Sequence, residues 1–76
     1  MTKKKWMKIF ASRVNNNMNI RCINQKELSE ATGISKTTIS RYLQGRQLPK
    51  TDAVLNIAKA LDCTVAELIY VDEMIH

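Results

Sequence analysis

Residues 24–45 read NQKELSEATGISKTTISRYLQG, and this stretch decides the fold of the 76-residue chain. Asn24 is a favourable N-cap and opens a close relative of the capping box. A short apolar helix face follows before Gly33, which can end a helix in the left-handed conformation. Ser35 can cap the next helix, which is predicted to stop at Gly45. Two helices joined by so tight a turn must cross steeply, as in a helix-turn-helix unit.

One helix is predicted upstream of this unit. Apolar residues recur every three or four positions from Met7 to Met18, which is typical of one buried helix face. The asparagines at 15–17 lower helix propensity, so we expect this helix to end near them and leave a long connection over residues 15–23. The first five residues are expected to form a basic N-terminal arm that contains Lys3, Lys4 and Lys5.

Two helices are predicted downstream. One begins at Thr51 or Asp52 with an apolar stripe, and the next opens at Thr64, where a Thr-x-x-Glu spacing completes a capping box. Residues 70–76 form an apolar C-terminal tail. No strand pattern competes, so the sequence predicts an all-α, five-helix domain over residues 1–76.

The charges are divided along the chain. The sequence carries 12 Lys/Arg and 7 Asp/Glu, for a formal net charge of +5. Residues 1–50 hold eleven of the basic and two of the acidic side chains, whereas residues 51–76 hold one basic and five acidic ones. Such a division favours attraction of a polyanion to one face, with nucleic acid the usual candidate. A merely soluble basic protein is the alternative.

Length and residue types argue against several function classes. The chain is too short for a nucleotide-binding α/β sheet or a lidded catalytic cleft. Cys22 and Cys63 belong to no CxxC motif or His pair, so we expect neither disulfides nor zinc, and a reduced, cytoplasmic protein. No catalytic constellation is present, and the lone His76 is terminal, so we expect no enzyme activity and no cofactor. No membrane span, targeting segment or effector-sensing domain is recognised.

The candidate site is the predicted helix over residues 35–44. With roughly 100° per residue, its polar side chains fall within an arc of roughly 140°, opposite its apolar ones. This arc carries no acid and offers donors to phosphate and guanine, although ordinary solvated helices also have polar faces. We expect the helix to enter a DNA major groove. The predicted base-contacting residues are Lys36, Thr37, Thr38, Ser40 and Arg41.

The segment from Gln25 to Gly45 closely resembles the helix-turn-helix of the lambda-repressor-like, Cro and Xre group. The resemblance continues through Leu48-Pro49 and the two downstream helices, and covers about residues 24–69. It implies a DNA-binding transcriptional regulator, a repressor of the phage or Xre type, that reads an operator in double-stranded DNA.

Individual roles follow from the same resemblance. Lys36, Thr37 and Arg41 match positions that read bases, and Gln25 matches the position that binds backbone phosphate at a helix N-terminus. Arg46, which follows the predicted recognition helix, resembles the residue that makes a further phosphate contact in this family. The predicted phosphate-contacting set also contains Asn24, Gln44 and Lys50, with Lys3, Lys4 and Lys5 as arm contacts.

The apolar C-terminus predicts a homodimer on a palindromic operator, because one recognition helix reads only a few base pairs. It can also pack onto the domain's own core, and the chain is either a compact regulator or a piece of a longer one. A rival class is an antitoxin that binds a toxin partner and contacts DNA secondarily. A protein that binds single-stranded nucleic acid, with Trp6 and Phe10 as its stacking platform, is a less favoured alternative, since the chain has only four aromatic residues. The predicted dimer interface consists of Val65, Ile69, Tyr70, Val71, Met74 and Ile75.

Overall fold

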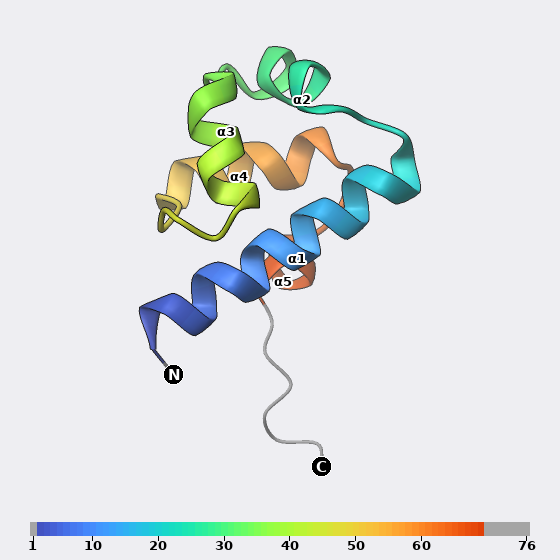
Figure 1. Ribbon diagram of the computed structural model, residues 1–76. Coiled ribbons are helices and arrows are strands. Elements are labelled where there is room, and N and C mark those ends of the chain that lie inside the picture. Colours follow the sequence, from blue (N-terminus) through green and yellow to red (C-terminus); the bar gives the residue numbers. More distant parts are fainter. Residues whose placement is uncertain (1, 70–76) are drawn as a thin grey trace.

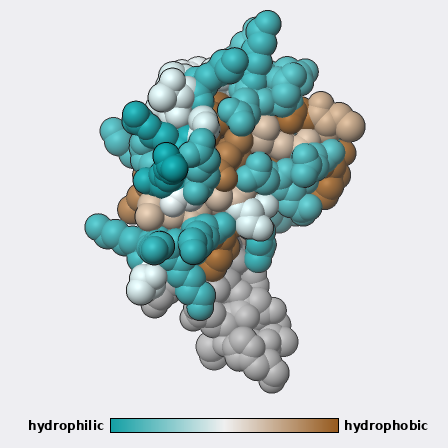
Figure 2. Space-filling model, in the orientation of Figure 1, coloured by the Kyte–Doolittle hydropathy of each residue, from teal (hydrophilic) through white to brown (hydrophobic). Residues whose placement is uncertain are grey.

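Five α-helices build the part of the chain that the computed structural model describes, residues 2–69 (Figure 1). No strand occurs within these residues, so the predicted all-α class with five helices is confirmed. In the same orientation, Figure 2 shows a mainly hydrophilic surface over α3 and over the N-terminal half of α1. The helices are α1 (Lys3–Arg21), α2 (Gln25–Thr32), α3 (Lys36–Leu43), α4 (Thr51–Ala60) and α5 (Val65–Ile69).

Helix α1 continues through the asparagines at which the sequence predicted its end. The side-chain amides of Asn15 and Asn17 each donate a 2.9 Å hydrogen bond to the carbonyl oxygen four residues earlier. Because these amides bond to the helix's own backbone, they do not favour another backbone conformation. The helix ends where Cys22 adopts the left-handed conformation, with φ 55°. The predicted long connection over residues 15–23 is therefore wrong, and only residues 22–24 link α1 to α2.

The predicted basic arm is wrong as well, because its three lysines form the first turn of α1. Thr2 caps this turn, and its hydroxyl oxygen accepts a 3.1 Å hydrogen bond from the amide of Lys5. Further along, Trp6 stacks on Phe10 with ring centroids 5.6 Å apart and packs against the core. The aromatic pair therefore holds the start of α1 in place and is part of the core edge instead of a platform for single strands.

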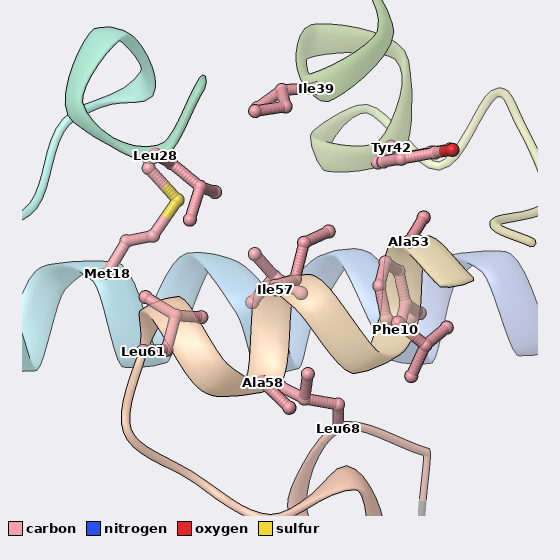
Figure 3. Close-up of a cluster of buried hydrophobic side chains, with 12 residues drawn as sticks. Phe10, Met18, Leu28, Ile39, Tyr42, Ala53, Ile57, Ala58, Leu61 and Leu68 are labelled. Atoms are coloured by element: carbon pink, nitrogen blue, oxygen red, sulfur yellow. The ribbon is translucent and has the colours of Figure 1, made fainter. Parts of the chain in front are cut away.

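Side chains from all five helices meet in one hydrophobic core (Figure 3). Leu28, Leu61 and Leu68 have no exposed surface. The ring of Phe10 meets the ring of Tyr42 edge to face at 6.1 Å, which joins α1 to α3. The predicted apolar stripes of α1 and α4 are confirmed by the remaining core residues, which include Val14, Met18, Val54, Ile57 and Ala58.

Two arginines of α1 tie that helix to the C-terminal part of the fold. The guanidinium of Arg21 donates to the carbonyl oxygen of Asp62, and that of Arg13 donates to the carbonyl oxygen of Glu67, each at 3.0 Å. The predicted capping box at Thr64 is present: its amide donates to the Glu67 carboxylate at 3.0 Å, and the Glu67 amide donates to its hydroxyl at 3.2 Å. Helix α5 is thereby fixed against α1.

We predict that Leu61→Ala lowers the free energy of unfolding by roughly 2–5 kcal/mol, because it leaves a cavity in a close-packed core. The matched control is Ile20→Ala, which shortens a side chain that is 69% exposed. This control should cost less than about 1 kcal/mol. Urea unfolding followed by circular dichroism measures both, and equal losses would contradict the described core.

The two cysteines should differ in reactivity. Cys22 is exposed, whereas Cys63 is half-buried and packs against the core. Burial raises the pKa of the Cys63 thiol, and the nearby Glu67 carboxylate raises it further. Because the thiolate is the reactive form, we predict that iodoacetamide at pH 7.5 alkylates Cys22 several-fold faster. Peptide mass spectrometry over time follows both sites, and faster alkylation of Cys63 would contradict the packing.

Candidate nucleic-acid interface

The turn between α2 and α3 sets the angle at which α3 is presented. Gly33 ends α2 with φ +76°, a conformation that L side chains rarely adopt, although a β-carbon there would meet no atom within 4 Å. The Ser29 hydroxyl donates to the carbonyl oxygen of Ile34, and the Ile34 amide donates to the Thr32 hydroxyl at 3.2 Å. Hydrogen bonds from α2 on both backbone groups of Ile34 therefore hold the turn.

Both helices of the unit begin with the predicted caps. At α2, the Asn24 side chain accepts from the Glu27 amide at 2.8 Å, and the Glu27 carboxylate accepts from the Asn24 amide at 3.1 Å. At α3, the Ser35 hydroxyl accepts from the Thr38 amide at 3.2 Å and donates to the Thr38 hydroxyl at 3.0 Å. The Asn24 side chain, a predicted phosphate contact, therefore also caps α2, and the Thr38 hydroxyl, a predicted base contact, is bonded to the cap of α3. Their DNA contacts remain predictions.

Helix α3 has one buried and one exposed face, as predicted. Ile39 is 1% exposed and Tyr42 is 4% exposed, so they hold the helix against the core. Ser40 is half-buried and its hydroxyl accepts a 2.8 Å hydrogen bond from the exposed Gln44 side chain. No acidic residue occurs on α3. Among the predicted base contacts, Lys36, Thr37 and Arg41 are exposed to solvent.

The predicted phosphate contacts lie around this helix. Gln25 is exposed in the first turn of α2. Arg46 and Lys50 are exposed in the connection from α3 to α4, and the Arg46 amide donates to the carbonyl oxygen of Arg41 at 2.9 Å. The structure therefore brings Arg46 directly to the C-terminal end of α3.

Lys8 of α1 lies beside the C-terminal end of α3 and is not among the predicted site residues. The backbone of Gly45 passes so close to α1 that a β-carbon on it would lie 3.6 Å from both the Cα and the Cγ atom of Lys8. The amide side chain of Asn15, two turns further along α1, donates to the carbonyl oxygen of Leu43 at 3.2 Å. One side of α1 therefore borders the C-terminal end of α3. No local sequence signal indicates this contact, because it joins distant parts of the chain.

The predicted dimer residues divide between described and undescribed parts of the chain. Val65 and Ile69 line an apolar hollow of about 320 Å³ together with Trp6, Leu48 and Leu55. Tyr70, Val71, Met74 and Ile75 lie outside the described residues.

Residues 2–69 contain neither a metal-binding cluster nor a membrane-spanning helix. No group of three His, Cys, Asp or Glu side chains in that part is placed to hold a metal ion. None of its helices has the length and apolar character needed to cross a membrane.

Comparisons with known proteins agree with this geometry. The chain is 33% identical over 61 residues to the cryptic phage CTXphi transcriptional repressor RstR of Vibrio cholerae, a match that covers 80% of this chain and 55% of that protein. The chain thus spans about half the length of this curated relative. The restriction-modification controller protein C.AhdI from Aeromonas hydrophila shares the fold, with a TM-score of 0.78 at 21% identity over 82% of this chain and 94% of that chain.

The family model of the Cro/C1-type HTH DNA-binding domain matches residues 13–73, which is most of the chain. Its match contains the whole of α2, the Gly33 turn and α3. This family is defined by DNA binding and not by catalysis. The helix pair joined at Gly33 and the acid-free α3 agree with this match, which shows that the chain belongs to the Cro/C1-type helix-turn-helix DNA-binding family.

Proposed function

We propose that the chain is a transcriptional regulator that reads an operator in double-stranded DNA with α3. The observation that carries this proposal is the outer face of α3, which is exposed, free of acids and fixed to the core by Ile39 and Tyr42. The similarity to RstR, a transcriptional repressor, favours repression. A repressor of this size acts by occupying the operator and so excluding polymerase.

In the proposed complex, α3 lies in the major groove with its N-terminal turn foremost. Lys36 donates to guanine, and the methyl group of Thr37 meets a thymine methyl. Arg41 lies about 7.5 Å further along the helix axis than Lys36, where its guanidinium can bond to a second guanine. Gln25 and Arg46 bind phosphates on either side and fix the register of the helix on the duplex.

The caps and the turn make this arrangement rigid before DNA arrives. The turn residue Ile34 is bonded through both backbone groups, and Ser35 closes the first turn of α3. A preformed recognition helix loses little conformational entropy on binding, which favours affinity.

We also propose that two copies bind together on a palindromic operator. The hollow between α1, α4 and α5 is apolar, and at its rim Leu48 and Leu55 are 42% and 45% exposed. Contact of this surface with the same surface of a second copy would bury these side chains around a two-fold axis. The rival antitoxin function requires a toxin partner, and the similarity to the repressor RstR favours transcriptional regulation instead.

We predict different effects for the two classes of DNA contact. Arg41→Ala should reduce discrimination at one base pair by about 1–3 kcal/mol, because it removes a base-edge contact. Gln25→Ala should weaken all sequences alike, because it removes a phosphate contact. Selection from a random duplex library with the wild-type protein supplies the operator, and titrations with single-base variants measure both effects.

Lys59→Ala is the control for these titrations, since Lys59 is exposed on α4 and outside the proposed interface. It should change neither preference nor affinity. If Arg41→Ala keeps the full base preference at every position, α3 does not read the operator as described.

The dimer proposal has its own test. Leu55→Glu should raise the dissociation constant of the dimer at least about tenfold, or 1.4 kcal/mol, because it places a charge in an apolar contact. The control Ile20→Glu alters a side chain that is 69% exposed near the C-terminal end of α1, whereas the hollow adjoins Trp6 near its N-terminal end. It should leave the dimer intact. Sedimentation velocity measures both, and a wild-type monomer at micromolar concentration would contradict the proposal.

A further inference from the structure

We propose that the N-terminal half of α1 is a second DNA-binding element, in which Lys4 and Lys8 bind backbone phosphates beside the segment that α3 reads. This inference rests on the proposed DNA-binding function. It adds a contact outside the helix-turn-helix unit and assigns a role to Lys8.

The N-terminal half of α1 lies outside the family match. The match begins at residue 13, whereas α1 begins ten residues earlier, at Lys3. The added turns carry no acidic residue, and the first acid in the chain is Glu27. Four of the 12 basic side chains of the protein lie on them: Lys3, Lys4, Lys5 and Lys8.

Two of these lysines lie on the side of α1 that borders α3. Lys8 borders Gly45 at the end of α3, and Asn15 bonds to the carbonyl oxygen of Leu43. Residues spaced by four and seven positions share one side of a helix. Lys4 therefore lies on the same side of α1 as Lys8 and Asn15, the side that borders α3. Both lysines are exposed.

Lys8 is next to a predicted phosphate contact. Gly45, which Lys8 borders, directly precedes the exposed Arg46. Lys4 and Lys8 are separated by about 6 Å along the helix axis. A flexible ammonium group binds phosphate as a point charge and needs no exact orientation. The two lysines thus extend the charge of Arg46 along the edge of the interface.

The N-terminal half of α1 is fixed relative to α3 by aromatic contacts. Trp6 stacks on Phe10, and Phe10 meets Tyr42 of α3 edge to face. On its other side, Trp6 lines the apolar hollow with Leu48 and Pro49 of the connection that follows α3. Lysines on a helix held in this way lose less freedom on binding than lysines on an unfolded arm.

The test is the salt dependence of binding to the duplex selected with the wild-type protein. Each phosphate contact contributes about 0.9 to the slope of log K against log salt concentration. The double variant Lys4→Gln/Lys8→Gln should therefore lower the slope by about 1.8 with unchanged base preference. Lys4→Arg/Lys8→Arg keeps the charges and should keep the slope. Lys59→Gln is the matched control and should also keep it.

Circular dichroism and urea unfolding confirm that the variants keep the fold. If the wild-type protein binds its selected duplex and the double Gln variant shows the same slope, α1 is not a DNA-binding element and the proposed function stands. If the wild-type protein selects no duplex at all, the proposed function fails, and the inference fails with it.

Discussion

The burial of Ile39 and Tyr42 is the constraint on which the rest of the structure depends. These two side chains hold α3 against the core by one face, and the helix repeat then turns Lys36, Thr37 and Arg41 toward solvent. The positive φ of Gly33 and the bonds to Ile34 fix where the helix begins. The basic side chains of α3 are available to a DNA partner because the opposite face of the helix is anchored in this way.

The helix-turn-helix unit was predictable because its signals are local. Asn24, Gly33 and Ser35 each act on neighbouring backbone groups, so their identity and spacing define where the helices end and begin. The outward face of α3 followed from periodicity alone. Base and phosphate contacts remain predictions, since they depend on a DNA partner.

The N-terminal third of the fold was harder to predict because tertiary contacts decide it. Asparagines usually weaken helices, yet Asn15 bonds across to the carbonyl oxygen of Leu43, and Asn15 and Asn17 both bond back to their own helix. Three adjacent lysines suggest an unfolded arm. Trp6, however, stacks on Phe10, which contacts Tyr42 of α3, and this packing favours a helix. The proximity of Lys8 to Gly45 depends on the same packing and has no sequence signal.

The core of the described residues contains no buried polar or charged side chain. The arginines that tie α1 to α5 and to the connection before it donate to neutral carbonyl oxygens, whose bonding does not depend on carboxylate ionisation. Folding therefore relies on apolar burial, which salt does not screen, whereas attachment to a polyanion relies on charges that salt does screen. A rise in ionic strength can therefore detach the protein from DNA while leaving it folded. Salt concentration then controls the occupancy of the DNA without controlling the stability of the fold.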